Sequence, residues 1–266
     1  MKNAIPAHNL LGVNVHACEP EQAIQAVLDS AQQQQHLSVA CLASYSLVAA
    51  INNPDHQKRL NALSLKVCDG QPVRWALNHF YRVRMQQRVY GPKLMSDLIS
   101  HAEQLGLPCY FYGGNPPALE GMLVQLAERH PALKIAGMHA GRYERISAAE
   151  QAHIAQTIRD SGARLVFVGL GTPRQDIWLY EHRDLIPAPC IAVGAAFDYY
   201  ANLLTQPPAW MGRWGLQWLH RLLQDPRRLW RRYLLNNSRY VYEMLRQQFR
   251  GPRALLHGEA PYRGDA

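Results

Sequence analysis

The stretch LVFVGLGTPRQDIW, residues 165–178, decides the class of fold. Its four leading apolar residues are typical of a strand buried in a parallel sheet, and the Gly-Leu-Gly that follows allows a tight turn. Pro173 suits the first turn of a helix, because the N–H that proline lacks has no partner there. The stretch therefore predicts a strand, a turn and a helix, which is the repeating step of an α/β protein.

The same alternation runs through the middle of the chain. Short apolar segments bounded by polar or glycine-containing turns predict strands at residues 37–43, 65–68, 109–112, 133–138, 165–170 and 190–193. Helical patterns lie between them, for example at residues 92–105, 117–129 and 148–160. Strands that alternate with helices predict a mainly parallel sheet covered on both faces. In such sheets, ligands bind beyond the carboxyl ends of the strands.

The composition is that of a protein with a large core and no covalent cross-links. The chain has 266 residues, of which 48% are hydrophobic, enough to bury a core without disulfides or metal. The cysteines are odd in number and scattered, so we expect buried, reduced thiols at Cys18, Cys41, Cys68, Cys109 and Cys190. The chain starts without a secretory signal and has no apolar run of membrane-spanning length. We therefore expect a cytoplasmic protein that is soluble or lies on a surface.

The positive charge is concentrated near the carboxyl end. Residues 213–253 contain ten arginines and two acids, which accounts for the whole net charge of +8. Three tryptophans and several leucines alternate with these arginines in a helical pattern that Pro226 should interrupt. Such a segment predicts a polyanionic partner: nucleic acid, an anionic membrane surface or a phosphorylated substrate. We expect a catalytic domain at residues 1–204, a helical appendage at 205–253 and a flexible tail at 254–266.

Aspartates stand in the loops that follow the predicted strands at residues 65–68 and 190–193. In CDGQP, residues 68–72, Asp69 either forms an Asx-turn or acts as a partly desolvated general base, and the residues alone favour neither. In GAAFDYY, residues 194–200, Asp198 has aromatic neighbours that could stack on a base. A third loop, YGGNPP at residues 112–117, offers glycines for close backbone approach to a ligand or for turn formation.

The loop GLGTPRQD, residues 169–176, differs from a dinucleotide-binding fingerprint. Arg174 stands where G-x-G-x-x-G has its third glycine. The helix start still offers N–H groups to an anion, and Gln175 and Asp176 could contact a base or ribose. The alternative is a plain helix cap, in which Asp176 favours the helix dipole. The sequence contains no Walker A motif, no Asp-x-Asp and no G-x-S-x-G, and its histidines lack the spacing of a metal site.

Taken in order, these loops and the basic segment resemble the WecG/TagA/CpsF family of bacterial glycosyltransferases. The matching motifs are DGQPVRWAL from Asp69, QRVYGPKLM from Gln87, FYGGNPPALEGM from Phe111, HPALKIAGMHAGRY from His130, VGLGTPRQDIWLYEHR from Val168, AVGAAFDYYAN from Ala192 and WGLQWLHRLLQDPRRLWRRY from Trp214. They run through most of the chain, and an ordered series of this kind is far more specific than any one motif.

The resemblance implies an inverting, UDP-sugar-dependent hexosyltransferase that extends a polyprenyl-diphosphate-linked saccharide, here in exopolysaccharide biosynthesis. It implies a Rossmann-like α/β domain with a carboxyl-terminal appendage that meets the membrane and completes the active site. No metal or other cofactor is expected. The expected partners are the UDP-sugar, the polyprenyl-diphosphate-linked acceptor and an anionic membrane surface, with no nucleic acid, and a homo-oligomer is compatible with the resemblance. The expected location is the cytoplasm, peripherally bound to the inner face of the cell membrane.

The resemblance also assigns roles to residues. Asp69 matches the catalytic base and Arg88 the arginine that follows it, while Gln175 and Asp198 match the nucleotide side. The remaining substrate-binding positions are Gly113, Gly141, Gly171, Asp176, Arg221, Arg228 and Arg231.

This sequence departs from the family pattern in several places. Cys41 and Ala43 replace a Thr-x-Asn, Lys93 replaces an aspartate, and Gln217 replaces the glutamate of an LEWL motif. These changes suggest a different donor sugar. Two alternatives remain. One is a Rossmann-type oxidoreductase, whose fingerprint has a third glycine that this sequence lacks, and the other is a nucleic-acid-binding protein that uses the basic segment.

Overall fold

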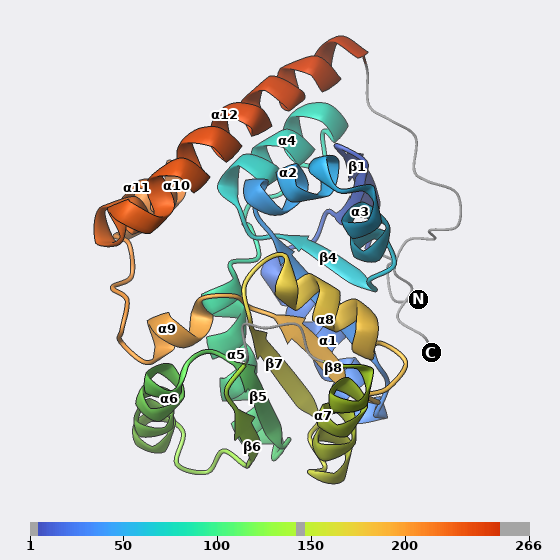
Figure 1. Cartoon of the computed structure of the whole chain (residues 1–266), viewed down its shortest axis with the longest axis vertical. Helices are drawn as coiled ribbons and strands as arrows, with labels where there is room; N and C mark the ends of the chain where they lie inside the picture. The colour runs from blue at the N-terminus through green and yellow to red at the C-terminus, as the bar shows by residue number, and fades with distance from the viewer. Residues whose placement is uncertain (1–4, 142–146, 251–266) are drawn as a thin grey trace.

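The computed structural model describes residues 5–141 and 147–250, and these residues form one mainly parallel sheet (Figure 1). The strand order is β1-β2-β4-β3-β8-β7-β5-β6, and only the β1–β2 pair is antiparallel. The strands are β1 (Ala7–Leu10), β2 (Val13–His16), β3 (Leu37–Leu42), β4 (Leu65–Cys68), β5 (Cys109–Gly113), β6 (Ile135–His139), β7 (Leu165–Gly169) and β8 (Pro189–Ala192).

Helices cover both faces of the sheet, as predicted (Figure 1). One face carries α1 (Pro20–Gln33), α5 (Gly91–Leu105), α6 (Pro116–Arg129) and α9 (Ala196–Tyr200). The other carries α2 (Ser44–Asn52), α3 (Pro54–Asn61), α4 (Gln71–Tyr81), α7 (Ala148–Asp160) and α8 (Arg174–His182). The appendage consists of α10 (Ala209–Arg213), α11 (Gln217–Gln224) and α12 (Pro226–Arg250).

Each central strand contributes to two separate cores. In β7, Phe167 packs with α1, α5 and α6, whereas Val166 and Val168 pack with the helices of the opposite face. Side chains alternate across a strand, so a strand buried on both faces is mainly apolar along its whole length. This geometry explains the continuous apolar runs of the sequence and confirms the α/β prediction.

The β1–β2 hairpin was not predicted. Its two strands are joined by Leu11 and Gly12, both with positive φ (55° and 88°), and Leu10 pairs with Val13. Two-residue hairpin turns with positive φ at both positions favour Asn-Gly, and Leu-Gly lacks that signal. The hairpin is nevertheless well anchored, because Leu10, Val13 and Val15 are fully buried.

The basic segment is helical, and Pro226 interrupts it as predicted, since α11 ends at Gln224 and α12 begins at Pro226. The long helix α12 lies across α2 and α4 (Figure 1). The hydroxyl of Tyr240 donates to the carbonyl of Pro72 (3.1 Å), and the side-chain oxygen of Gln247 accepts from the N–H of Leu11 (3.1 Å). The hairpin, which the sequence did not predict, is therefore one of the surfaces on which α12 packs. The division into domains stays a prediction, and the predicted tail at 254–266 lies outside the described residues.

Candidate functional site

The loops selected from the sequence meet at one edge of the sheet, because the strands that precede them are parallel. Backbone hydrogen bonds join the loops to one another. The N–H of Asp69 donates to Leu42 (2.9 Å), and the N–H of Gly114 donates to Gly169 (2.9 Å). The N–H of Gly141 in turn donates to Gly114 (3.2 Å). Segments far apart in sequence thus form one continuous rim.

Asp69 follows β4 and points toward the start of α5. Its carboxylate accepts from the N–H of Gly91 at 3.0 Å, a residue well beyond its own turn. Burial raises the pKa of this carboxyl, while the positive charge of Arg88 and the Gly91 N–H oppose that rise. The side chain is only partly covered. Asp69 can therefore bind a proton more readily than an ordinary aspartate and still reach a substrate.

Arg88 lies beside Asp69. Its Nη1 donates to the backbone carbonyl of Asp69, and its Nη2 donates to the side-chain oxygen of Gln217 in α11. The guanidinium also lies over the ring of Tyr90, 4.7 Å from the centroid. Glu19 holds the preceding loop by accepting from the backbone N–H groups at positions 86 (2.6 Å) and 87 (3.0 Å). Arg88 thus forms hydrogen bonds to both the loop of Asp69 and the appendage.

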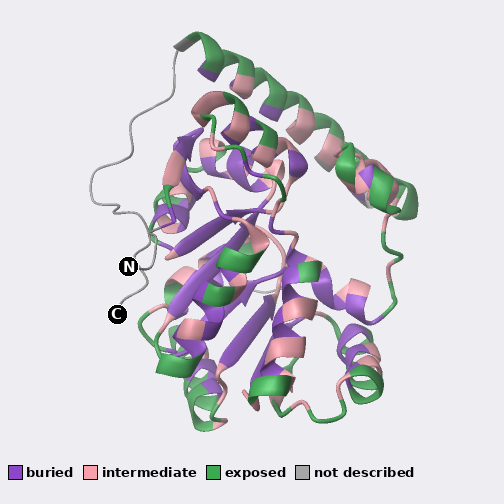
Figure 2. Cartoon of the chain, turned by 180° about the vertical axis from the view of Figure 1, so that it is seen from behind, coloured by how far each residue is buried: buried purple, intermediate pink, exposed green. Residues whose placement is uncertain are grey.

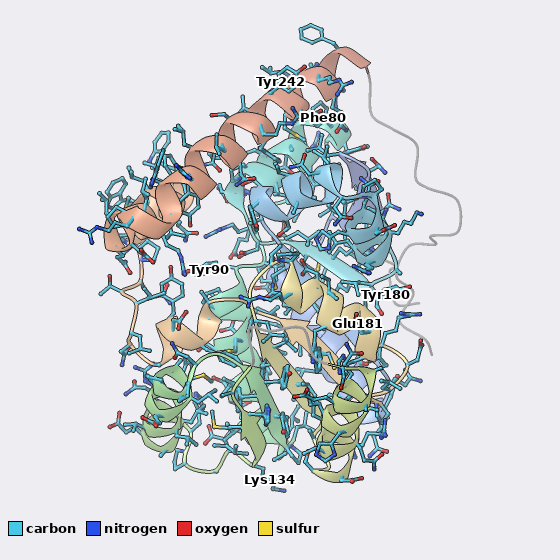
Figure 3. The ribbon with its side chains drawn as sticks, viewed as in Figure 1. Phe80, Tyr90, Lys134, Tyr180, Glu181 and Tyr242 are labelled. Carbon is cyan, nitrogen blue, oxygen red and sulfur yellow. The ribbon has the colours of Figure 1, made fainter. Side chains whose placement is uncertain are left out.

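Asp198 belongs to a second group, which joins α9 to the appendage. Arg221 lies over the ring of Tyr199 at 5.5 Å. Burial alone would lower the pKa of Arg221, but Tyr199 and Asp198 outweigh it and raise that pKa. Tyr90 donates to Gln206 (3.3 Å), and burial raises the pKa of its phenol. Figure 3 shows Tyr90 between α9 and the appendage.

The aromatic residues beside Asp198 differ from expectation. Phe197 is buried and stacks edge-on against Phe111, with 6.0 Å between ring centroids, and Tyr200 is also buried. These two rings belong to the core and are not available to a base. Tyr199, which is partly exposed, is the aromatic neighbour that remains at the site.

The strand, turn and helix predicted at residues 165–178 are present, with β7 ending at Gly169 and α8 beginning at Arg174. Gly171 has a positive φ of 74°, and a Cβ there would meet no atom within 4 Å. Gln175 is buried, and its side-chain oxygen accepts from the N–H of Gly171 at 3.0 Å. Gln175 therefore fixes the shape of this turn, and its contact with a nucleotide stays a prediction.

Asp176 points away from the open edge. It is fully buried in the first turn of α8, with its Oδ2 3.6 Å from Nε2 of His56 in α3. Burial raises the pKa of Asp176 to about 7, slightly offset by Thr172, and burial lowers the pKa of His56. Asp176 thus lies among protein side chains in the core, and its substrate-binding role stays a prediction.

Gly113 and Gly141 allow three strand ends to pack closely. A Cβ at Gly113, whose φ is 115°, would lie 2.6 Å from the carbonyl carbon of Gly169. A Cβ at Gly141 would lie 2.9 Å from Cα of Gly113. Larger residues at these positions would push the strand ends apart. Gly171 differs from them in facing open space, as a ligand-approaching glycine must.

The three appendage arginines have different surroundings. Arg221 lies next to Tyr199, near Asp198. Arg231 is exposed and lies over the ring of Trp230, 5.2 Å from the centroid. The side chain of Arg228 is outside the described part of the chain. Sequence reasoning did not select Tyr90 or Gln217 as site residues. Tyr90 stands two residues after Arg88 in QRVYGPKLM, but no local pattern joins Gln217 to Arg88.

The five cysteines are free and buried, as expected. Within residues 5–141 and 147–250, no three His, Cys, Asp or Glu side chains are grouped closely enough to hold a metal ion. Over the same residues, no helix has both the length and the hydropathy that crossing a membrane requires.

Comparison with known proteins gives one family. The model of the Glycosyl transferase WecG/TagA/CpsF family matches residues 8–254. The N-acetylglucosaminyldiphosphoundecaprenol N-acetyl-beta-D-mannosaminyltransferase of Bacillus subtilis (strain 168) is 27% identical over 201 residues, or 75% of each chain. The protein of the same name from Bacillus spizizenii (strain ATCC 23059 / NRRL B-14472 / W23) is 28% identical over 200 residues, again 75% of each chain. The family match extends from the β1–β2 hairpin to the end of α12.

Proposed function

Because this chain belongs to the WecG/TagA/CpsF family of glycosyl transferases, we propose that it transfers a sugar from a UDP-sugar to a polyprenyl-diphosphate-linked saccharide, with inversion. The names of the two Bacillus relatives specify N-acetylglucosaminyldiphosphoundecaprenol and a transferred N-acetyl-beta-D-mannosaminyl group. The product here would be an intermediate of an exopolysaccharide or another cell-surface polymer. The observation that carries the proposal is the contact of Asp69 with Arg88, beside the Asp198–Arg221 group.

In this reaction Asp69 is the general base. A hydroxyl of the acceptor attacks the anomeric carbon on the side opposite UDP and forms the new carbon–oxygen bond. Its proton passes to Asp69, and UDP leaves with the electron pair of the broken bond. The raised pKa of the Asp69 carboxyl supports this role, because a base is most effective when its pKa approaches the working pH. Arg88 keeps the carboxylate ionised enough to accept the proton.

The leaving diphosphate needs positive charge near it. The chain has no Asp-x-Asp motif for a metal–diphosphate contact, so arginines are the proposed suppliers. Arg88 lies over the ring of Tyr90 and Arg221 over the ring of Tyr199. Guanidinium groups of this kind can donate parallel hydrogen bonds to phosphate oxygens. We assign Arg228 and Arg231 to the diphosphate of the acceptor, nearer the membrane.

The donor nucleotide would lie along the rim formed by the ends of β5, β6, β7 and β8. Gly171, where an added Cβ would meet no atom within 4 Å, allows the nucleotide to approach the backbone closely. Gln175 and Asp198 would hold the uridine end. In this assignment Gly113, Gly141 and Asp176 shape the pocket through packing more than through direct contact. Cys41 stands where the family pattern has a threonine, and it is buried next to Gly91. This replacement would change the contacts to the donor sugar.

The outer face of α12 is the proposed membrane contact. Helical periodicity places Trp230, Leu234, Val241 and Leu245 on one side of the helix, opposite Leu229, Tyr240, Glu243 and Gln247. The first set is exposed (Trp230 48%, Leu234 62%), whereas the second is buried toward the protein. Figure 2 shows the exposed outer side along the length of the helix.

The charge on this helix supports the same assignment. Glu243, the acid within α12, is 5% exposed and pairs with Arg239 (2.7 Å) and Arg246 (3.5 Å). The buried carboxylate therefore lies away from the exposed side of the helix, which carries apolar side chains and Arg231. Each basic residue near an anionic leaflet contributes roughly 1 kcal/mol of attraction. The protein would then lie on the inner face of the cell membrane without spanning it.

The experiment that tests this function is a panel of UDP-sugars, each incubated with the protein and a polyprenyl-diphosphate-linked amino-sugar acceptor. Mass spectrometry of the lipid should show a gain of one sugar residue for one donor of the panel. Unchanged lipid with every donor, on vesicles to which the protein binds, would contradict the proposal. We expect the surroundings of Gln175 and Cys41 to select the donor sugar, so the panel also identifies that sugar.

A further inference from the structure

Arg88 is held between the loop of Asp69 and the appendage by two uncharged acceptors. Its Nη1 donates to the backbone carbonyl of Asp69, and its Nη2 donates to the side-chain oxygen of Gln217. The ring of Tyr90 covers one face of the guanidinium at 4.7 Å. Both acceptors are neutral, so these bonds orient the guanidinium without cancelling its charge.

Gln217 is itself well placed for this contact. It is the first residue of α11, and the backbone before it lies against α4, the helix that begins just after Asp69. The side chain of Gln71 donates to the carbonyl of Arg213 (3.2 Å), and a Cβ at Gly215 would lie 3.0 Å from the ring of Trp75. The segment 213–217 is thus fixed to the first turns of α4, and Gln217 reaches Arg88 from there.

We propose that Gln217 is a positioning residue that couples the appendage to the catalytic loop. Its side-chain oxygen holds Arg88 in the orientation that faces Asp69 and the diphosphate, and its neutrality leaves the full charge of Arg88 available to both. The inference rests on the proposed transferase function. It concerns how the proposed Asp69–Arg88 pair is held, and it implies that Arg88 is ordered only when the appendage is packed in place.

The identity of the residue at 217 matters because of charge. A carboxylate there would form a stronger, charge-assisted bond to Arg88 but would neutralise part of its charge. The other titratable groups that face Asp69 are the thiols of Cys41 and Cys68 and the phenol of Tyr90. Burial raises the pKa of each of them, that of Cys68 to about 12, so they stay uncharged near neutrality. Arg88 is therefore the charge that acts on Asp69.

Two substitutions at Gln217 test this role, with two matched controls on the same helix. Gln217→Met removes the acceptor, and Gln217→Glu keeps the shape but adds a charge. Gln224→Met and Gln224→Glu repeat both changes at a glutamine that bonds to Thr205 and His220 instead. The measurements are kcat and KM for each substrate, the pH profile of kcat, and flotation with anionic vesicles.

We expect Gln217→Met to lower kcat about tenfold or more, the usual effect of losing a hydrogen bond to a charged group, with KM for the donor little changed. In Gln217→Glu the weaker charge of Arg88 lets the pKa of Asp69 rise. Because Asp69 must be ionised to act as a base, the acid limb of the kcat profile should move to higher pH. Flotation should be unchanged in all four variants.

The inference is overturned if the Gln217 variants match the Gln224 variants in kcat and pH profile. It is also overturned if both Gln217 variants lose kcat equally while the acid limb does not move, since that pattern means a structural contact alone. Titration of the Asp69 carboxyl by ¹³C NMR, assigned with Asp69→Asn, decides the charge effect without turnover. A protein that transfers no sugar, but whose Asp69 pKa rises in Gln217→Glu, would refute the proposed function and keep the positioning role.

Discussion

At the level of single residues, the proposed sugar transfer depends on a carboxylate that is neither fully exposed nor neutralised. Asp69 gains basicity from burial and loses part of it to Arg88 and the Gly91 N–H. An aspartate in an exposed turn would be too weak a base, and one paired directly with a guanidinium would be weaker still. The bond from Arg88 to the backbone carbonyl of Asp69 keeps the charge near without consuming the carboxylate oxygens.

The substitution Asp69→Asn should lower kcat about 10²- to 10⁴-fold, the usual contribution of a positioned base. UDP binding and the melting temperature should be nearly unchanged, because asparagine keeps the shape and can still accept from Gly91. Steady-state kinetics, with calorimetry for UDP binding, measure both effects. Asp184→Asn, at a carboxylate that is 78% exposed, serves as the control and should behave as wild type. Near-normal turnover by Asp69→Asn would exclude the base assignment.

Asp176 gives a prediction about stability and pH. Its pKa is raised by burial to about 7 from an ordinary value of 3.8, so the folded protein disfavours the ionised form. Stability is therefore lost as the pH rises from the unfolded toward the folded pKa. Asp176→Asn, which cannot ionise, should raise the melting temperature relative to wild type more at pH 8 than at pH 4. A difference that is constant over this range, or larger at pH 4, would contradict the burial argument.

The rim glycines give a third prediction. Gly113→Ala combines an unfavourable φ of 115° with a Cβ 2.6 Å from the backbone of Gly169. We expect a loss of about 3 kcal/mol in the free energy of unfolding. Gly162→Ala also has a positive φ, 69°, but open space around it, so about 1 kcal/mol is expected there. Urea unfolding measures both, and equal losses would show that close packing of the strand ends contributes nothing.

At the scale of helices and strands, the sequence predicted what local pattern controls. The apolar runs fixed the central strands to within two residues or so, because each is buried on both faces. Pro226 marked the break between α11 and α12 for a covalent reason. The β1–β2 hairpin was missed because its Leu11-Gly12 turn lacks the usual residues. The packing of α12 on that hairpin could not be predicted, because Gln247 and Leu11 are distant in sequence.

The outer face of α12 gives the prediction that belongs to this scale. Replacing Trp230, Leu234 and Leu245 by serine should weaken flotation with anionic vesicles more than tenfold, because the apolar contact is lost. The buried face of the helix is untouched, so the fold should persist. Truncation before Trp210 should go further and leave a soluble, nearly inactive protein.

The control for this experiment is a triple serine variant at Leu105, Leu123 and Val124, which are similarly exposed on α5 and α6. It should float like wild type. If the α12 variant floated equally well, or if the truncated chain did, the membrane role of the appendage would be wrong.

At the scale of the whole molecule, the site is assembled from three parts of the chain. The sheet edge supplies Asp69 and Asp198, and the appendage supplies Gln217 and Arg221. The loop between α4 and α5 supplies Arg88 and Tyr90. The sequence located the aspartates because strand ends can be read locally. It could not pair Arg88 with Gln217, which are separated by 129 positions. If the appendage binds the membrane surface as proposed, an active centre that it closes would make turnover depend on whether the protein is bound there.

This arrangement separates the function from the alternatives considered at the outset. The family match excludes an oxidoreductase of the Rossmann type. Binding to nucleic acid would use the arginines but leave the apolar outer face of α12 without a role. A transferase at a membrane surface uses both, together with the carboxylate and arginine pairs at the sheet edge.

Sugar transfer with Asp69 as the base is best measured by following UDP release and the mass of the acceptor lipid in one reaction on anionic vesicles. Wild-type protein should release one UDP for each sugar added to the lipid, and Asp69→Asn should slow both equally. Release of UDP without a gain in lipid mass would mean hydrolysis of the donor. That result, or equal rates for wild type and Asp69→Asn, would contradict sugar transfer with Asp69 as the base.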